Sequence, residues 1–346
     1  MRNWVGLVAT GVYVPAQVQD AAYIAARTGI PEEVIREKFG IRKKHVGGED
    51  DHISVMALAA ARRALEQAAR EVPGFEPADL DVVIYCGSEY KDYRLWSCSA
   101  MLQYELGARR AYAFDLMALC AGGVLALKAA RDQILADPQI NNVLVVAASR
   151  EASLVDYRNQ RTRFMFNFGD GAAAAILRRN HAANRLLGIA ALTDGSFHAD
   201  VKVPAGGTVY PPLQVAIPPE RWYLDVTDPS GMKERLDAVS LDNFLRVIRR
   251  AVQASGFETK DIRLLLPVHM KRSMHRAILQ RLGLPEDRSV YLEEYGHVQA
   301  ADQIIGLEEA KRRGLLRAGD LVVLVAAGTG YTWAAAALQW GPVRDI

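Results

Sequence analysis

The sequence predicts an α/β protein made of two similar halves, each with helices covering both faces of a largely parallel sheet. Three observations support this fold class. The length of 346 residues is that of two domains or of one large duplicated unit. A short sequence pattern occurs once in each half of the chain. Continuous apolar strands also alternate with helical patterns, which is typical of sheets covered on both faces.

The repeated pattern is G-F-E-x-x-D followed by Leu or Ile, at 74–80 and at 256–262. A helical pattern precedes each copy (54–70 and 243–254), and an apolar run follows it (82–85 and 264–266). A second pair of features keeps the same order: an apolar strand (143–148 and 321–325), then a Gly-x-Gly turn and an alanine-rich strand (172–177 and 333–338). We therefore expect a duplication with halves at 1–180 and 181–346.

Composition excludes several classes of protein. A formal net charge of +2 creates no field that would attract nucleic acid. Three cysteines are too few for a disulfide scaffold or a zinc cage, and they fit a reducing compartment, so we expect a cytoplasmic protein without a metal site. The segment 321–341 has no charged residue, but its β-branched residues and its Gly328–Gly330 turn predict two strands rather than a membrane helix. No signal peptide is expected.

Cys120 is the predicted nucleophile. It follows the expected strand 111–117 and precedes Gly122, Gly123 and a strong helix-forming run, so it lies at a strand-to-helix junction. The unpaired N–H groups at a helix N-terminus favour the thiolate, which is the reactive form. Cys86 and Cys98 lie in apolar surroundings and are interpreted as structural.

Two histidines are candidates to assist the nucleophile. His269 comes at the end of the buried strand 264–268, and His297 follows Tyr295-Gly296 before another helix. Ligands of such sheets bind at the carboxyl ends of the strands, where these side chains gather. His275 is expected to face outward from the helix that follows His269.

Taken together, these motifs resemble the β-ketoacyl-ACP synthase III family. The match consists of A-F-D-x-x-A-x before Cys120, F-G-D-G-A at 168–172, a strand-end His269, Y-G at 295–296 and G-x-G-x-T-W at 328–333. The resemblance implies the thiolase fold, with duplicated βαβαβαββ halves in a five-layer α-β-α-β-α sandwich. It also implies that Cys120 takes the acyl group as a thioester, and that His269 is an active-site imidazole. The N–H of Gly330 would join that of Cys120 in binding the thioester oxyanion.

One departure from the family is His297, which stands where type III synthases have Asn. A Cys-His-His set is similar to that of the elongating ketoacyl synthases. Two neutral imidazoles would then donate hydrogen bonds to a malonyl thioester as carbon dioxide leaves.

The resemblance further implies coenzyme A and carrier-protein thioesters as substrates, with no resident cofactor. Lys38 stands where the family places an Arg that meets coenzyme A, and Arg42, Lys271 and Arg272 are the other candidate contacts. Solvated helix faces are an equal explanation for these basic residues. A homodimer is implied, with 95–104 near the partner subunit.

The expected reaction is decarboxylative Claisen condensation of a Cys-bound acyl group, taken from acyl-CoA, with malonyl-ACP or malonyl-CoA. An alternative is the non-decarboxylative condensation of the hydroxymethylglutaryl-CoA synthase type, with Glu89 as the base. Glu89 is otherwise a loop carboxylate paired with Lys91 or Arg94. Acyl transfer to an oxygen or nitrogen nucleophile, and an inactive partner subunit, are the remaining alternatives.

Overall fold

One continuous sheet runs through the protein, and its two ends come from the two halves of the chain. The computed structural model describes residues 3–212 and 216–342, and within them the strand order is β11-β12-β13-β8-β1-β7-β6-β4-β5. The first half supplies β1 (Val5–Tyr13), β4 (Val82–Tyr85), β5 (Tyr112–Asp115), β6 (Asn142–Ser149) and β7 (Gly171–Arg179). The second supplies β8 (Ala183–Thr193), β11 (Ile262–Pro267), β12 (Leu321–Gly328) and β13 (Thr332–Pro342).

The join between the halves is narrow. A single backbone pairing, Gly6 with Arg185, connects β1 to β8. Glycine is required at position 6 because a Cβ there would lie 2.4 Å from the carbonyl oxygen of Ala183. The turn between β7 and β8 follows Arg179. The division of the chain at 180/181 stays a prediction.

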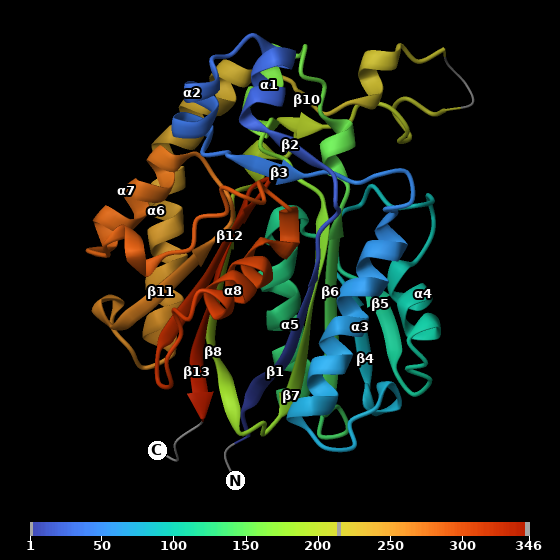
Figure 1. Ribbon diagram of the computed structural model, residues 1–346, viewed down its shortest axis with the longest axis vertical. Helices are drawn as coiled ribbons and strands as arrows, with labels where there is room; N and C mark the ends of the chain where they lie inside the picture. The colour runs from blue at the N-terminus through green and yellow to red at the C-terminus, as the bar shows by residue number, and fades with distance from the viewer. Residues whose placement is uncertain (1–2, 213–215, 343–346) are drawn as a thin grey trace.

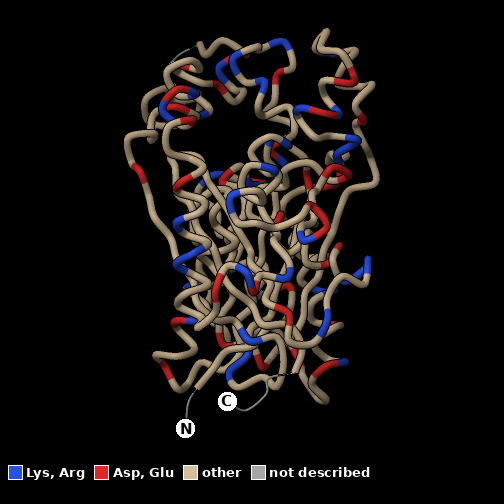
Figure 2. The backbone as a smooth tube through the Cα atoms, turned by 90° about the vertical axis from the view of Figure 1, so that its left-hand side faces the viewer, with Lys and Arg blue, Asp and Glu red and all other residues tan. Residues whose placement is uncertain are grey.

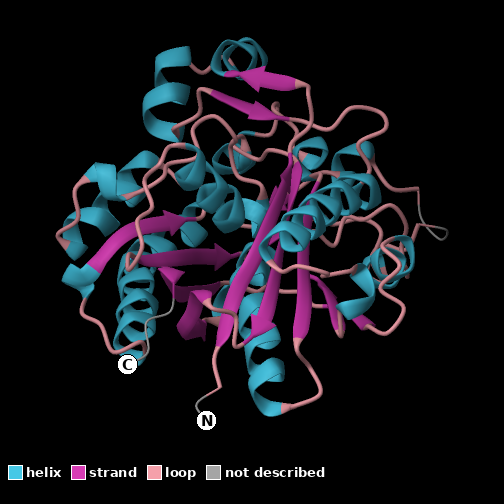
Figure 3. Ribbon diagram, turned by 60° about the horizontal axis from the view of Figure 1, so that its bottom comes forward, coloured by secondary structure: helices cyan, strands magenta, loops and turns pink. Residues whose placement is uncertain are grey.

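Three helix layers cover and separate the two parts of the sheet, which gives the expected five layers (Figure 1). α3 (Ile53–Glu71) and α4 (Cys98–Glu105) pack on the outer face of the first half. α6 (Pro229–Ala254) and α7 (Arg272–Leu282) pack on the outer face of the second. Between the two sheet halves lie α5 (Gly122–Ala136) and α8 (Asp302–Arg312), in the largest apolar cluster. Figure 3 shows the strands at the centre with helices around them.

The repeated sequence pattern has a local structural cause. In each copy the Asp carboxylate accepts the backbone N–H of the Glu three residues before it, at 2.9 Å (Asp79 to Glu76) and 2.8 Å (Asp261 to Glu258). These are capping boxes, which start the short 3-10 turns that lead into β4 and β11. The pattern therefore marks the same turn in the two halves.

Smaller elements lie near the top of the sheet in Figure 1. They are β2 (Val18–Asp20), α1 (Ala21–Thr28), α2 (Glu32–Val34) and β3 (Lys43–His45), with the short pair β9 (Val201–Lys202) and β10 (Asp225–Val226). Lys, Arg, Asp and Glu are interspersed along the chain in Figure 2 rather than separated by sign.

Leu265 of β11 forms an isolated bridge with Ser289, which lies outside the strands. One helix differs from the prediction. α6 begins at Pro229 rather than near 243, because Asp228 caps it and Pro229 suits its first turn. The segment 204–219 contains no strand and no helix before Pro219 in its described part, and 213–215 lie outside the described residues.

Candidate active site

Cys120 lies at the junction predicted for it. β5 ends at Asp115, a 3-10 turn spans Leu119–Ala121, and α5 starts at Gly122. Leu119 has a φ of 50°, a left-handed conformation that sharpens the turn. The Cys120 side chain is only 5% exposed. The turn thus presents one thiol at the N-terminal end of a helix in the central layer.

His297 contacts the thiol directly. Its Nε2 lies 3.1 Å from Cys120 Sγ, and its Nδ1 lies 2.7 Å from Asp302 Oδ2. Burial alone would lower the pKa of His297, but the charges of Asp302 and Cys120 raise that pKa well above its ordinary value. A nucleophile, a base and a carboxylate that orients the base form the arrangement of an activated-nucleophile triad.

Asp302 is the residue that sequence reasoning missed. It is fully buried, and it also accepts the N–H groups of Val298 (2.6 Å) and His269 (2.7 Å). The sequence alone explains Asp302 as an acidic residue in the first turn of α8, where such residues stabilise a helix. That explanation does not indicate that its carboxylate also contacts His297.

His269 lies on the other side of Asp302. Its Nδ1 is 2.9 Å from Asn167 Nδ2, and its Nε2 is 3.1 Å from the Gly40 carbonyl oxygen. Burial lowers the pKa of His269 to about 4, so this imidazole is neutral at pH 7. The expectation of two neutral imidazoles therefore describes His269 and not His297, whose pKa moves in the opposite direction. Two titratable groups pushed apart in this way are suited to different roles.

Gly330 lies in the turn between β12 and β13, with a φ of 107°. The residue whose backbone lies against the Cys120 turn is Gly328, where a Cβ would be 3.1 Å from the Cys120 nitrogen and 2.8 Å from that of Ala121. The close approach explains the first glycine of the G-x-G pattern. The donation of an N–H by Gly330 to an oxyanion stays a prediction.

Glu89 makes no hydrogen bond with Cys120, His269 or His297 in the described part of the chain, although its charge acts on the buried Glu151. Glu89 is exposed, and no hydrogen bond or ion pair joins its carboxylate to the described part of the chain. The expected partners are engaged elsewhere: Lys91 pairs with Asp115 at 2.6 Å, and Arg94 donates to the Gly206 carbonyl.

A second carboxylate near His297, besides that of Asp302, belongs to Glu151, which sequence reasoning did not single out. Its Oε1 accepts from Ser88 Oγ at 2.7 Å and from Gln299 Nε2 at 2.8 Å. Burial raises the pKa of Glu151. It reaches the site from the segment that follows β6, and no spacing in the sequence links it to Gln299.

A buried lysine supports the floor of the site. Lys44 is fully buried, and its ammonium donates to the Phe168 carbonyl. Burial lowers the pKa of Lys44 to about 7, against the opposing effect of Asp170. The Phe168 ring meets the His297 imidazole edge to face, with centroids 5.1 Å apart. Lys44 therefore holds in place the Phe168 residue whose ring contacts His297.

The four candidate coenzyme contacts differ in exposure and in charge pairing. Lys38 and Lys271 are exposed. Arg42 pairs with Glu294 at 3.1 Å, and Arg272 pairs with Glu293 at 2.7 Å while its guanidinium covers the Tyr291 ring. The two arginines are partly neutralised, which leaves the two lysines as the unpaired cations of this set.

His275 does not face outward, contrary to the expectation. It is 3% exposed, and its Nε2 lies 2.9 Å from Ser289 Oγ. The partner hydroxyl comes from the segment that pairs with β11, which a helical pattern alone does not show.

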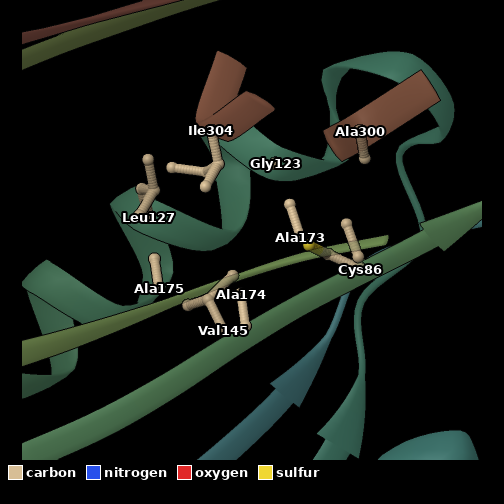
Figure 4. Close-up of a pocket in the computed structure, with 10 residues that line it drawn as sticks. Cys86, Gly123, Leu127, Val145, Ala173, Ala174, Ala175, Ala300 and Ile304 are labelled. Atoms are coloured by element: carbon tan, nitrogen blue, oxygen red, sulfur yellow. The ribbon is translucent and has the colours of Figure 1, made fainter. Parts of the chain in front are cut away.

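A small cavity lies between the central helices and the sheet (Figure 4). Its volume is about 10 Å³, enough for about one water molecule, and its lining is apolar. Leu127 of α5, Ile304 of α8 and Ala173–Ala175 of β7 line it, beside Gly123 and Ala300. It is a packing defect of the central layer, since an acyl chain does not fit in it.

Comparison with known proteins shows the family to which this chain is similar. The 3-oxoacyl-[acyl-carrier-protein] synthase III family model matches residues 114–195, and the model of that family's C-terminal part matches 252–340. The chain is 31% identical to a β-ketoacyl-[acyl-carrier-protein] synthase III of Roseiflexus castenholzii, with 98% of this chain and 99% of that protein covered. It is 30% identical to the protein of that name from Symbiobacterium thermophilum, covering 97% and 98%.

A crystal structure of 3-oxoacyl-[acyl-carrier-protein] synthase III from Aquifex aeolicus superimposes with a TM-score of 0.82 at 26% identity, covering 97% of this chain and 100% of that one. No helix within 3–212 and 216–342 is long and apolar enough to cross a membrane. In those same ranges, no group of three or more His, Cys, Asp or Glu side chains is arranged to hold a metal ion.

Proposed function

The chain belongs to the β-ketoacyl-[acyl-carrier-protein] synthase III family and is an acyltransferase, and from that premise we propose that it performs decarboxylative Claisen condensation at Cys120. The observation that carries the proposal is the contact of 3.1 Å between Cys120 Sγ and His297 Nε2, at a helix N-terminus. This arrangement prepares a thiolate for attack on a thioester.

The first step is acylation. The Cys120 sulfur attacks the carbonyl carbon of an acyl-CoA, the bond from that carbon to the coenzyme sulfur breaks, and His297 passes its proton to the departing thiolate. Because the pKa of His297 is raised, the imidazole takes a proton again from solvent. It then has an Nε2–H to donate, while Asp302 keeps the ring in place.

The second step forms the carbon–carbon bond. A malonyl thioester loses carbon dioxide, and the electron pair of the broken bond becomes an enolate. The enolate accepts hydrogen bonds from His297 Nε2–H and from His269 Nε2–H, which gives up its contact with the Gly40 carbonyl oxygen in this step. The enolate carbon attacks the Cys-bound carbonyl. The oxyanion so formed lies against the N–H groups of Cys120 and Gly330, and its collapse expels the Cys120 thiolate with release of a β-ketoacyl thioester.

The substrates are proposed by family membership. Acyl-CoA is the donor, and malonyl-ACP or malonyl-CoA is the extender. Lys38, Arg42, Lys271 and Arg272 are proposed to meet the coenzyme, with the two unpaired lysines on its phosphates. No resident cofactor takes part. We also propose a cytoplasmic homodimer in which the exposed Leu95 and Tyr104 lie near the partner subunit.

A second function, acyl transfer to a hydroxyl or amine, is favoured by Asp302. With Asp302 behind it, His297 can remove a proton from an O–H or N–H group at Nε2 once it has given its own proton to the departing coenzyme thiolate. That group would attack the Cys-bound acyl carbon and expel the thiolate. Condensation needs only a hydrogen-bond donor where His297 stands. The Asp302 carboxylate also makes His297 a base, and condensation does not require a base there. The Glu89-dependent alternative has weaker support, because Glu89 is exposed.

Intact-mass measurement tests the proposal. We would incubate the protein and its Cys120→Ala variant with a panel of acyl-CoAs, then add malonyl-ACP, malonyl-CoA or a hydroxyl acceptor. A gain of one acyl group that is absent from Cys120→Ala, followed by release of carbon dioxide and a β-ketoacyl product, supports condensation. Acylation that is discharged only by the hydroxyl acceptor supports acyl transfer instead.

His297→Asn separates the two functions further. An asparagine amide still donates a hydrogen bond but cannot accept a proton at neutral pH. Acylation of Cys120 is expected to slow in this variant, so the two functions are compared on protein that is already acylated. There the condensation step is expected to survive, while acyl transfer to a hydroxyl is expected to fall by roughly 100-fold or more. Equal loss of both activities would contradict the assignment of different roles to this residue.

A further inference from the structure

Asn167 connects the two imidazoles of the site. It lies between the 3-10 turn Gln160–Met165 and β7, directly before Phe168, and is 8% exposed. Its carbonyl oxygen accepts the His297 backbone N–H at 2.8 Å, and its side-chain Nδ2 lies 2.9 Å from His269 Nδ1. One residue thus fixes the backbone of one imidazole and the ring of the other.

The side-chain contact selects a tautomer of His269. An amide nitrogen can only donate, so Nδ1 must be the acceptor and the single ring proton of the neutral imidazole must be on Nε2. The Nε2–H then has an acceptor in the Gly40 carbonyl, 3.1 Å away. The opposite amide orientation would need the proton on Nδ1, and a bare Nε2 would face the Gly40 oxygen lone pair to lone pair.

The arrangement carries a cost that packing alone does not explain. Asn167 Oδ1 is buried without a hydrogen-bond partner in the described part of the chain. Burying an unpaired polar atom costs about 1–3 kcal/mol. An aliphatic side chain would avoid that cost, so the amide is best explained by what its nitrogen does to His269.

We propose that Asn167 is a positioning residue that holds His269 as the neutral Nε2–H tautomer, so that His269 serves only as a hydrogen-bond donor and His297 is the only base. The inference rests on the proposed function for its catalytic meaning. The tautomer itself is a property of the resting protein and does not depend on any substrate.

The experiment is ¹⁵N NMR of the full-length protein labelled at histidine, near pH 7 and without substrate. The His269 signals would be assigned by their loss in His269→Gln. The expected spectrum has Nδ1 in the unprotonated range and Nε2 in the protonated range. A wild-type spectrum with the proton on Nδ1, or with an even mixture of tautomers, would overturn the proposal, and this result needs no variant that might fail to fold.

Two substitutions extend the test. Asn167→Leu removes the donor and leaves only the Gly40 carbonyl oxygen to favour Nε2–H, so we expect the Nδ1–H tautomer to appear beside the Nε2–H tautomer. Asn167→Asp supplies an acceptor, and we expect the proton to move to Nδ1 and the titration of His269 to shift to higher pH. Asn159→Leu is the matched control, because the Asn159 amide donates to Asp225 rather than to an imidazole, at 3.1 Å. An unchanged tautomer in Asn167→Leu would also overturn the proposal.

The same variants have a kinetic readout. Acylation of Cys120 is expected to stay within about threefold of wild type in Asn167→Leu, because His297 and Asp302 are untouched. The condensation step is expected to slow by roughly 10- to 100-fold, the usual effect of losing a partner that orients a functional imidazole. If condensation is absent from the wild type while the tautomer is as expected, the proposed function fails and the role of Asn167 in fixing the tautomer stands.

Discussion

The chain makes the same sharp turn twice, before α5 and before α8. In each case a non-glycine residue in the left-handed region, Leu119 (φ 50°) or Gln299 (φ 53°), opens a 3-10 turn that leads into a central helix. The two turns face each other so closely that a Cβ on Gly123 would lie 2.2 Å from the Ala300 carbonyl oxygen. The second residue of the turn is the nucleophile Cys120 in one half and Ala300 in the other.

The difference shows how a duplicated fold divides one reaction between its halves. The first turn exposes a thiol to the helix N-terminus, whereas the second begins its helix with Asp302, which holds His297 and the His269 backbone. The same type of turn therefore places the nucleophile in the first half of the chain and, in the second half, the carboxylate that orients the base. Five substitutions test this division of roles.

Removal of the nucleophile should have the largest effect. Cys120→Ala is expected to abolish acylation, a loss of at least about 10³-fold, since no other thiol lies at a helix N-terminus facing an imidazole. Cys86→Ala is the matched control. Cys86 is fully buried, and burial raises its pKa to about 12, so its thiol is not expected to react. Intact mass after incubation with acyl-CoA measures both, and residual acylation of Cys120→Ala would move the nucleophile elsewhere.

Asp302→Asn should have the next largest effect. The amide can keep one backbone contact but cannot stabilise a protonated His297, so the raised pKa of that imidazole is expected to fall. Acylation should slow by roughly 10²–10⁴-fold, and the pH at which it is half-maximal should shift. Stopped-flow release of coenzyme A across pH 5–9 measures this. A rate with an unchanged pH profile would show that Asp302 only shapes the fold.

His275→Gln should change the pH dependence of the free energy of unfolding and leave the catalytic rate unchanged. His275 lies on α7 in an outer layer, so this variant tests a region apart from the two turns. Burial lowers the pKa of His275 to about 4 from 6.5, so the folded state binds fewer protons than the unfolded state between those values. Stability is therefore lost as pH falls from 6.5 to 4, by on the order of 2–3 kcal/mol from this residue. Glutamine can keep the contact with Ser289 and does not titrate.

Thermal unfolding at pH 7.5 and pH 4.5 measures the effect of His275→Gln. The variant should lose less stability on acidification than the wild type does, while the exposed His198→Gln should behave as wild type. An identical pH dependence in His275→Gln would show that another group is responsible for acid sensitivity.

Glycine at the left-handed positions should give the smallest effects. Leu119→Gly relieves about 1 kcal/mol of backbone strain and loses a similar amount of chain entropy, so its net effect should be near zero. Gln299→Gly also removes the donor to Glu151, and it should destabilise by about 1–3 kcal/mol. Urea unfolding of the two variants measures the difference. Equal effects would show that the Glu151 contact does not stabilise the second turn.

The sequence predicted much of this molecule because its strongest signals are local. The G-F-E-x-x-D pattern encodes a capping box, and it predicted the duplication and the apolar strand that follows each copy. The five layers were implied by the resemblance to the family. The two strands of 321–341 were predicted from a glycine turn that the structure confirms. Each of these features depends on residues within a few positions of one another.

The rest could not be predicted because it depends on contacts between distant segments. Glu151 meets Gln299, Asn167 meets His269, and Ser289 covers His275, each across a different part of the fold. Glu89 looked like a candidate base because it follows a buried strand, but its loop turns toward solvent. Lysine is usually found at the surface, whereas Lys44 is fully buried.

The hydrogen bond between Cys120 and His297 also has a consequence for the synthesis of the chain. The two residues are 177 positions apart, so the nucleophile emerges from the ribosome well before its base. At about 5–20 residues per second, that interval is roughly 10 to 35 s. During it the nascent chain holds a thiol without its proton acceptor, and the enzyme cannot turn over a thioester until most of its second half has been translated.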